Sequence, residues 1–185
     1  MIDGVFDQAL AVSPREVLDV LRLGIKVYGG SSMGALRAAE LWTLGMTGIG
    51  RVFELYREEI VTAEDEVAIL FDADSETCLT EPLVNVRCAL ERAVADGLIA
   101  DALASRILAA AIALPYARRT YREIARAVAC DEGASIDALI PRLRAHDQKK
   151  ADALSLIQRV SRDLAALSAS PCPCDRDDGR TGGAD

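Results

Sequence analysis

The sequence predicts an α/β fold in which a small parallel, Rossmann-like sheet with a strand–elbow–helix motif precedes an all-helical C-terminal region. A β-branched and aromatic run at 25–28 leads through a Gly-Gly pair into a helix-favouring stretch at 33–44. A second apolar run, 67–71, is bounded by acids and is typical of a buried parallel strand. From 82 to 167 the pattern is helical. Strands separated by helices in this order favour parallel pairing through right-handed crossovers.

The first elements follow from local signals. Ser13 and Glu16 form a capping box with proline at the first helical position, so a helix begins at Pro14 and ends at Gly24. The strand at 25–28 and the helix at 33–44 come next, and Gly45 ends that helix. A further short amphipathic helix is indicated by three apolar residues at helical spacing: Val52, Phe53 and Tyr56.

The chain divides into three predicted segments. Residues 1–80 form the α/β core, residues 81–167 form a helical subdomain, and residues 168–185 form a disordered tail because they are polar and rich in Pro, Gly and Asp. Four or five helices are expected in the second segment. Their boundaries are predicted at Gly97, Pro115, Gly133 and Pro141.

Composition predicts a soluble, cytoplasmic protein. The 185 residues are 51% hydrophobic, but no apolar run approaches the ~20 residues that span a membrane, and the acidic start does not resemble a signal peptide. The formal net charge of −8 argues against nucleic acid as a partner, because its binding depends on clustered Lys and Arg. We therefore expect protein or small-molecule partners, with no membrane and no nucleic acid.

The five cysteines do not predict a disulfide framework, because their number is odd and they are widely scattered. Cys172 and Cys174 form a Cys-Pro-Cys pair that suggests a metal or redox site. Two thiolates one residue apart do not make a tetrahedral site, and the flanking sequence offers no histidine and no second pair. We expect no metal site.

The turn at 30–34 reads Gly-Ser-Ser-Met-Gly and matches G-x-S-x-G between a strand and a helix, where a nucleophile elbow belongs. In that geometry Ser32 presents its hydroxyl above the sheet edge. The N–H groups of Met33 and Gly34 begin the helix and favour an anion or a developing oxyanion. Gly30 lets a substrate approach the backbone closely. The alternative is an anion-binding or purely structural turn, since small residues at such turns also serve close packing.

Five segments, in order, resemble the TfuA family. They are Ile2-Asp3-Gly4-Val5-Phe6, SSMGALRAAEL at 31–41, GMTGIG at 45–50 with Val52-Phe53, DEVA at 65–68 and EPLVNVR at 81–87. The resemblance is clear over about residues 1–90. It implies a partner of a YcaO-type cyclodehydratase in installing thioamides on peptide backbones. It also implies a sulfur donor, in the simplest version a ThiS-like carrier protein with a C-terminal thiocarboxylate, and no cofactor.

The chain also departs from the family pattern. Family members usually carry some tens of residues before the Ile-Asp-Gly segment, so we expect this chain to be truncated at its N-terminus. Where the family often has His-Lys-Glu, this chain reads Pro14-Arg15-Glu16. Leu70-Phe71 replaces a histidine that is common shortly after Asp-Glu-Val-Ala.

The resemblance implies a chemistry for the elbow. Ser32 would attack the thiocarboxylate carbonyl, the Met33 and Gly34 N–H groups would stabilise the oxyanion, and sulfide would leave. Ser31, one step earlier on the turn, should be directed away and matter less for catalysis, and it is expected with Gly30 among the substrate-binding residues. The other expected substrate-binding residues are polar ones around the same cleft: Asp3, Arg37 facing the carboxyl terminus of the substrate with Glu40 holding it, and Asn85 with Arg87. Exposed ion pairing of Arg37 with Glu40, and a polar helix face for Asn85 and Arg87, explain these residues equally well.

The sequence does not identify the general base that would take the proton of Ser32. The only histidine, His146, lies in the distant helical region, Lys26 would have to be buried to lose its proton, and Asp3 follows a predicted strand at the edge where α/β folds place their sites. Two hypotheses therefore remain open. The chain is a serine-dependent hydrolase of a thiocarboxylated carrier, or it is a non-catalytic adaptor that docks the carrier on the YcaO enzyme.

Overall fold

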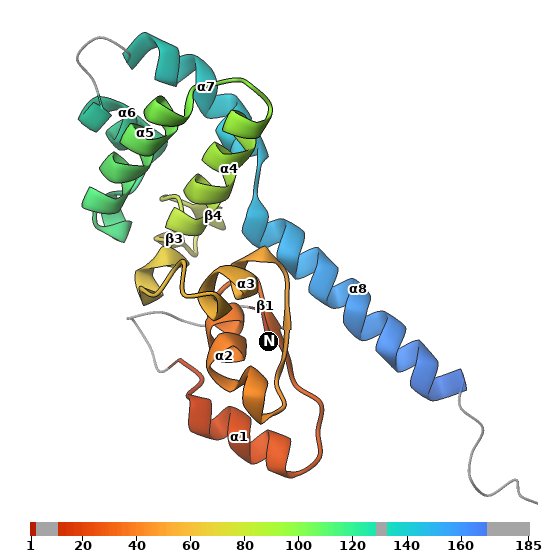
Figure 1. Cartoon of the computed structure of the whole chain (residues 1–185). Helices are drawn as coiled ribbons and strands as arrows, with labels where there is room; N and C mark the ends of the chain where they lie inside the picture. The colour runs from red at the N-terminus through yellow and green to blue at the C-terminus, as the bar shows by residue number, and fades with distance from the viewer. Residues whose placement is uncertain (3–10, 129–132, 170–185) are drawn as a thin grey trace, which may run out of the picture.

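The computed structural model describes residues 1–2, 11–128 and 133–169 of the chain. Figure 1 shows an α/β half, a group of helices beside it, and a long last helix that runs back along the α/β half and projects beyond it. The predicted fold class is confirmed. The α/β half contains α1 (Pro14–Arg22), β1 (Tyr28–Gly30), α2 (Met33–Leu41), β2 (Thr47–Ile49) and α3 (Arg51–Arg57).

The small sheet has β1 at its centre. β1 pairs in parallel with β2, with Tyr28 opposite Thr47 and Gly30 opposite Ile49. On its other side the Met1 ammonium donates to the carbonyl of Tyr28 at 2.7 Å, and the Gly30 N–H donates to the carbonyl of Met1 at 3.3 Å. This alternation is that of a parallel ladder, so Met1 lies beside β1 as a further strand-like segment. The turn after β1 is therefore enclosed by backbone on both sides.

The first helix forms as predicted. The Ser13 hydroxyl accepts from the Glu16 N–H at 3.3 Å, and the Glu16 carboxylate accepts from the Ser13 N–H at 2.8 Å. Both contacts are local in sequence, and proline fixes the first helical φ, so nothing distant is needed to start α1 here. After α1 ends, Gly24 takes a φ of +77°. The predicted strand at 25–28 begins later, at Tyr28.

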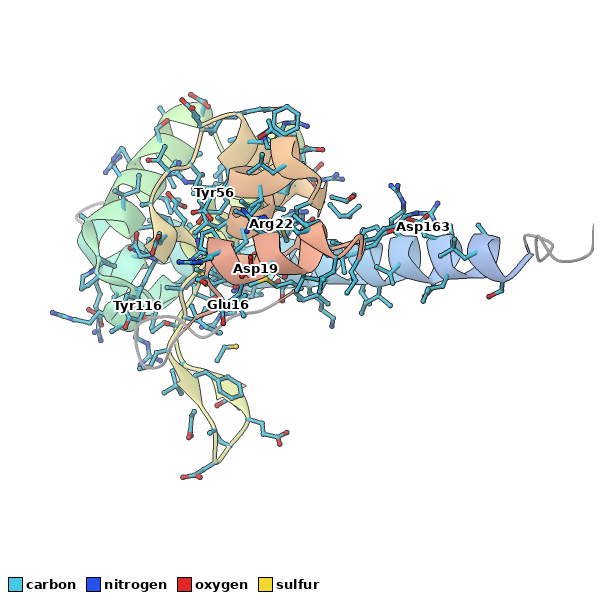
Figure 2. All side chains as sticks on the ribbon, turned by 90° about the horizontal axis from the view of Figure 1, so that it is seen from below. Glu16, Asp19, Arg22, Tyr56, Tyr116 and Asp163 are labelled. Carbon is cyan, nitrogen blue, oxygen red and sulfur yellow. The ribbon has the colours of Figure 1, made fainter. Side chains whose placement is uncertain are left out.

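The predicted buried parallel strand at 67–71 is wrong. Val67 and Ala68 are buried, but they follow a short 3-10 helix, Glu64–Glu66. Phe71 instead begins β3 (Phe71–Asp72), which pairs antiparallel with β4 (Thr77–Cys78). The Asp72 carboxylate accepts from the Asp74 N–H and the Ser75 hydroxyl, which fixes the tight turn between the two strands. Figure 2 shows this hairpin projecting from the body.

The strand that does pair with β1 is β2, which the sequence analysis missed. Gly48 at its centre has low strand propensity, so no alternating pattern is visible. A Cβ at Gly48 would lie 2.2 Å from the ring of Phe53 on α3. Glycine at this position is therefore required by the packing of α3 on β2, a contact that the sequence alone does not reveal.

The region after Pro82 is helical, as predicted, and contains α4 (Leu83–Ala95), α5 (Asp101–Ala113), α6 (Tyr121–Val128), α7 (Gly133–Ala145) and α8 (Gln148–Ala169). Pro141 does not separate two helices, contrary to the prediction, and lies inside α7. An interior proline removes one helical hydrogen bond, and its ring crowds the carbonyl four residues earlier, so α7 continues through Pro141 at a local energetic cost. None of the helices in the described part of the chain is long and apolar enough to cross a membrane.

The α/β half and the helical region each contain a hydrophobic cluster of buried residues. One extends from Val17 to Cys88 in sequence, and the other from Leu83 to Leu143, so α4 contributes to both. α8 leaves the helical group and packs on β1, β2 and α3. The division at residue 80 stays a proposal. The tail predicted after residue 167 lies outside the described residues from 170 onward.

The thiol of Cys88 gives a prediction about alkaline stability. Burial in the first cluster raises the pKa of Cys88 to about 12. The unfolded thiol titrates near its ordinary value of about 8.5, so above that pH the unfolded state releases a proton that the folded state keeps. We expect the free energy of unfolding to fall as pH rises from about 9 towards 12, with a contribution from this thiol of at most about 1.4 kcal/mol per pH unit. Cys88→Ala should remove that contribution.

Urea unfolding at pH 8, 9, 10 and 11 measures this slope. Cys78→Ala is the matched control, since Cys78 is exposed. Burial also raises the pKa values of Tyr56 and Tyr121, so the wild type minus Cys88→Ala difference is the informative quantity. Equal pH dependence in the wild type and in Cys88→Ala would contradict the prediction.

A candidate active site at the turn after β1

The turn between β1 and α2 is strained, and the strain lies one residue before the predicted nucleophile. Ser31 has a φ of +72°, whereas Ser32, the residue before α2, has a φ of −125°. A left-handed conformation at a non-glycine residue costs about 1–3 kcal/mol and is found preferentially at functional sites. In G-x-S-x-G elbows the nucleophilic serine itself sits on the sharp turn. We call residues 30–34 the elbow; Ser31 holds its strained position, and a catalytic role for the turn stays a prediction.

The glycines of the turn are required by close approach of backbone. A Cβ at Gly29 would lie 2.1 Å from the carbonyl oxygen of Gly34, and one at Gly30 would lie 2.5 Å from that of Ile49. A Cβ at Gly34 would lie 2.2 Å from the carbonyl oxygen of Met1. These residues thus serve close packing, as the structural interpretation of the turn expects, whatever else the turn does.

The start of α2 offers two backbone donors. The N–H of Ser32 is already used, since it donates to the carbonyls of Gly30 at 2.9 Å and Ile2 at 3.2 Å. Among the described residues, the N–H groups of Met33 and Gly34 donate no hydrogen bond. They lie at the positive end of the helix dipole. Two such donors can stabilise a negative oxygen held near the turn.

The two serine hydroxyls differ in their partners. The Ser31 hydroxyl donates to the carbonyl of Lys149, in the first turn of α8, at 2.7 Å. The Ser32 hydroxyl makes no hydrogen bond with any residue that the structure describes. Only 4% of Ser32 is exposed. Ser31 thus fastens α8 to the elbow, while Ser32 keeps an uncommitted hydroxyl in a closed setting.

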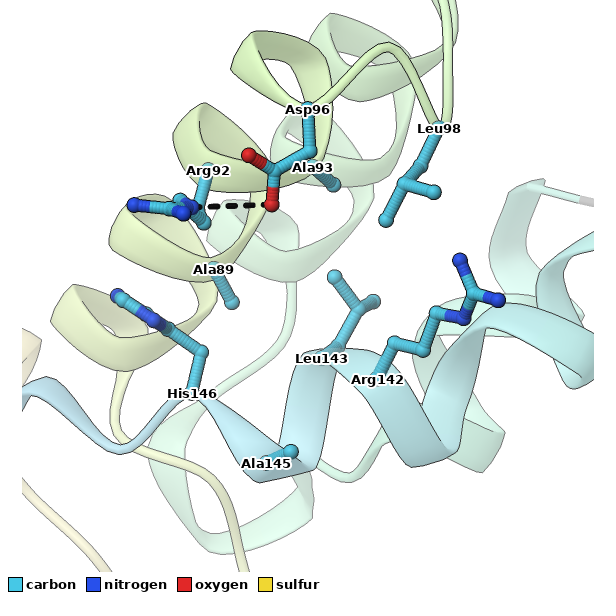
Figure 3. Close-up of a pocket in the computed structure, with 9 residues that line it drawn as sticks. All are labelled: Ala89, Arg92, Ala93, Asp96, Leu98, Arg142, Leu143, Ala145 and His146. Carbon is cyan, nitrogen blue, oxygen red and sulfur yellow. Dashed lines mark hydrogen bonds and ion pairs between the residues drawn. The ribbon is translucent and has the colours of Figure 1, made fainter.

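Two of the three base candidates from the sequence, Lys26 and His146, make no hydrogen bond with Ser32. Lys26 is exposed and precedes β1, at the end of the strand opposite the turn. His146 follows α7 and lines a hollow beside α4 (Figure 3). Asp3 lies outside the described residues. Within the described chain, no titratable side chain hydrogen-bonds the Ser32 hydroxyl.

A buried carboxylate that the sequence analysis missed lies at the same edge of the sheet. Asp152 of α8 accepts from the N–H groups of Arg51 at 3.1 Å and Val52 at 2.8 Å, and from the side chain of Gln148 at 2.7 Å. It caps α3, whose preceding residue Gly50 has no side chain to do so. Burial raises the pKa of Asp152, and the hydrogen bonds oppose that rise. In the sequence Asp152 is one acid of a helical segment far from the turn, and nothing in its neighbourhood indicates that it caps α3.

Arg37 and Glu40 form the ion pair that their spacing allows. An Nη of Arg37 donates to both carboxylate oxygens of Glu40 at 2.8 and 2.9 Å, and its Nε donates to the carbonyl of Val12 at 2.9 Å. Arg37 is buried. Its guanidinium therefore ties α2 to the segment before α1. Among the described residues, none of its hydrogen bonds goes to the elbow.

Asn85 and Arg87 take separate partners on α4. The Asn85 amide donates to Asp147 at 2.9 Å and accepts from the Lys149 N–H at 3.0 Å, so Asn85 reaches the elbow through Lys149. Arg87 makes a two-pronged ion pair with Glu66, at 2.7 and 3.0 Å. The structure thus gathers five of the predicted site residues at one turn: Gly30, Ser31, Ser32, Met33 and Gly34. Asn85 is linked to them indirectly, and Arg37, Glu40 and Arg87 are not.

The described residues contain no group of three His, Cys, Asp or Glu side chains that could hold a metal ion.

Comparison with known proteins adds one finding. A family model described as TfuA-like protein matches residues 3–120, which is more than half of the chain and includes β1, the elbow, α2 and α4. A search of curated proteins found no match.

Proposed function

Because the chain belongs to the TfuA-like family, we propose that it serves peptide thioamidation by hydrolysing a thiocarboxylated carrier protein at Ser32. Membership implies an accessory role in thioamidation, and the hydrolysis is the finer proposal. The sulfide released would be consumed by a YcaO-type cyclodehydratase that activates the peptide amide. The ThiS-like carrier and the YcaO enzyme are both partners in this proposal.

The observation that carries the proposal is the uncommitted Ser32 hydroxyl beside two N–H groups without partners among the described residues. The Ser32 Oγ would bond to the carbonyl carbon of the carrier's C-terminal thiocarboxylate. The carbonyl oxygen would become an oxyanion facing the N–H groups of Met33 and Gly34. Collapse of this intermediate breaks the C–S bond, and the sulfur leaves as hydrosulfide with the proton from serine. Water then cleaves the acyl-serine to give the carrier carboxylate.

The leaving group suits a site with few acids and bases. Hydrosulfide is a better leaving group than an amine, and the group that takes the serine proton can deliver it to the departing sulfur, so no separate general acid is required. A base for the serine proton is still needed. The proposal assigns this role to a carboxylate at the same edge of the sheet, Asp3 being the sequence candidate and Asp152 the one that the structure adds.

The alternative is an adaptor that holds the carrier against the YcaO enzyme without catalysis. Two observations favour it. The elbow is closed, since Ser31 and Ser32 are each only 4% exposed, and Arg37 is already engaged with Val12 and Glu40. In this interpretation the strained turn only shapes a binding surface.

Incubating the wild-type chain with a thiocarboxylated carrier distinguishes the hydrolase from the adaptor. Intact mass spectrometry follows conversion of thiocarboxylate to carboxylate, and a sulfide probe measures the product. The hydrolase proposal expects catalytic turnover above the rate of the carrier alone. Binding of the carrier without any acceleration would contradict it and support the adaptor.

A further inference from the structure

The first turn of α8 is held from the side by one residue of α4. Asn85 is 8% exposed; its amide oxygen accepts from the Lys149 N–H at 3.0 Å, and its amide nitrogen donates to Asp147 Oδ1 at 2.9 Å. The same Asp147 oxygen accepts from the Lys150 N–H at 3.0 Å. The first N–H groups of a helix have no partner within the helix, so Asn85 and Asp147 supply two of the missing acceptors. The position of Asn85 therefore fixes where α8 begins.

The link from α7 leaves the direction of α8 to its other contacts. Residues 146–147 separate the two helices without helical structure, and Figure 1 shows α8 leaving the helical group. Further along, Asp152 accepts from the first N–H groups of α3, and the Tyr28 hydroxyl donates to Asp163 at 2.7 Å. These contacts hold the rest of α8 on the α/β half. Loss of Asn85 would therefore loosen the first turn of α8 and leave the helix docked.

Lys149 connects this first turn to the elbow. Its carbonyl accepts from the Ser31 hydroxyl at 2.7 Å, and its ammonium donates to the carbonyl of Val67 at 2.8 Å. Ser31 has the strained φ of +72°. A strained residue persists only when its surroundings over-determine it, and the hydrogen bond to Lys149 is one such constraint. Because Ser31 continues directly into Ser32, the position of the Ser32 hydroxyl depends on where Lys149 lies.

We propose that Asn85 is a positioning residue for the elbow. By holding the first turn of α8, it lets the Lys149 carbonyl keep Ser31 in the strained conformation from which Ser32 presents its hydroxyl. Both polar atoms of the Asn85 amide are engaged by the start of α8, which argues against the substrate contact expected from the sequence. Asn85 takes no part in proton or acyl transfer. The inference rests on the hydrolysis proposed at Ser32, but its first test does not need that reaction.

The first test measures the elbow without the carrier. Ser32→Cys places a thiol at the buried position, and peptide mass spectrometry follows its labelling by iodoacetamide separately from the other cysteines. In this background Asn85→Ala should raise the labelling rate about fivefold, because the turn loosens by about one hydrogen bond. Ser31→Ala should do the same, and the two together should still give about fivefold rather than ~25-fold, since both break one chain of contacts. Tyr28→Phe removes a different hydrogen bond of α8 and should leave the rate unchanged.

An exchange of amide and carboxylate tests the contact between Asn85 and Asp147 itself. Asn85→Asp keeps an acceptor for the Lys149 N–H but sets two carboxylates against each other, so it should raise the labelling rate as Asn85→Ala does. Adding Asp147→Asn restores a donor between the two side chains and should return the rate to that of Ser32→Cys alone. In the chain with Ser32 intact, Asn85→Asp should lower kcat for the thiocarboxylated carrier about fivefold and leave KM unchanged, and the exchange should restore kcat.

The labelling and hydrolysis rates distinguish two kinds of failure. If the wild type does not hydrolyse the carrier, the proposed function is contradicted, and the labelling rates still decide the role of Asn85. Equal labelling with and without Asn85→Ala, or multiplicative effects of Asn85→Ala and Ser31→Ala, would overturn the inference. So would an exchange variant that labels as fast as Asn85→Asp. Circular dichroism checks folding, and if Asn85→Ala does not fold, the comparison of Asn85→Asp with the exchange variant decides alone.

Discussion

Ser32→Ala is expected to stop sulfide release from the thiocarboxylated carrier while leaving the fold intact. The Ser32 side chain makes no hydrogen bond with the described residues, so its removal leaves no partner unsatisfied, and alanine fits a helix start. Loss of a nucleophile costs up to about 10⁶-fold in rate in serine hydrolases. Sulfide release by the variant should therefore fall to the rate of the carrier alone, as followed by intact mass. Its urea midpoint should stay within the error of the wild type.

Ser31→Ala is the matched control and should show the reverse pattern. It breaks the hydrogen bond to the Lys149 carbonyl, which anchors α8 to the elbow, at a cost of about 1 kcal/mol in unfolding free energy. Its rate should stay within about tenfold of the wild type. If the wild type and Ser32→Ala convert the carrier equally slowly, and both still bind it, Ser32 is not a nucleophile and the adaptor is supported. If Ser31→Ala alone abolishes turnover, the residue with positive φ is the nucleophile.

The features that the sequence predicted best are those encoded within one helical turn. The capping box of Ser13 and Glu16 needs only neighbours three residues apart, and α1 begins where it indicates. The order strand, turn, helix is also local, because its glycines and its alanine-rich helix are contiguous. The strand predicted at 25–28 lies at Tyr28–Gly30, and the α-helix predicted at 33–44 ends at Leu41. The site roles given to the five residues of the elbow stay predictions.

The missed strand pairing depends on contacts between distant residues. The run at 67–71 has the composition of a strand, but Val67 and Ala68 satisfy their hydrophobicity by packing beside a 3-10 helix. Thr47–Ile49 has a weak strand signal and still pairs with β1. Its signal is weak because position 48 must be glycine, since the ring of Phe53 occupies the space beside it. Periodicity measures burial, and burial does not specify a hydrogen-bond ladder.

The surroundings of the elbow could not be predicted, because α8 brings them from more than 100 residues away. Lys149 supplies the carbonyl that receives the Ser31 hydroxyl, and Asp152 caps α3 beside the turn. In the sequence these residues belong to an ordinary amphipathic helix. The resemblance offered no help here, since the family match ends at residue 120.

Arg119→Ala is expected to cause the largest loss of stability among single substitutions in the described chain. Arg119 is 1% exposed, and its guanidinium donates to the carbonyls of Ala111 and Leu114 at the end of α5 and to the carbonyl and carboxylate of Asp65. Removing it leaves the carbonyls of Ala111 and Leu114 without their donor, whereas the Asp65 side chain is 40% exposed and can be hydrated. Each acceptor left without a partner away from water costs about 1–3 kcal/mol, so we expect a loss of about 2–4 kcal/mol.

Urea unfolding measures this loss, and the neighbouring residue provides the control. The Arg118 side chain is exposed and has only a long ion pair to Glu123 at 3.8 Å, so Arg118→Ala should change the unfolding free energy by no more than about 0.5 kcal/mol. Arg119→Lys should fall between the two, because one ammonium cannot reach both α5 and Asp65. Equal losses from Arg118→Ala and Arg119→Ala would contradict the assignment. The Arg119 guanidinium therefore connects the end of α5 to Asp65. The next residue, Glu66, pairs with Arg87 of α4, so the short segment 65–66 is held by both helices.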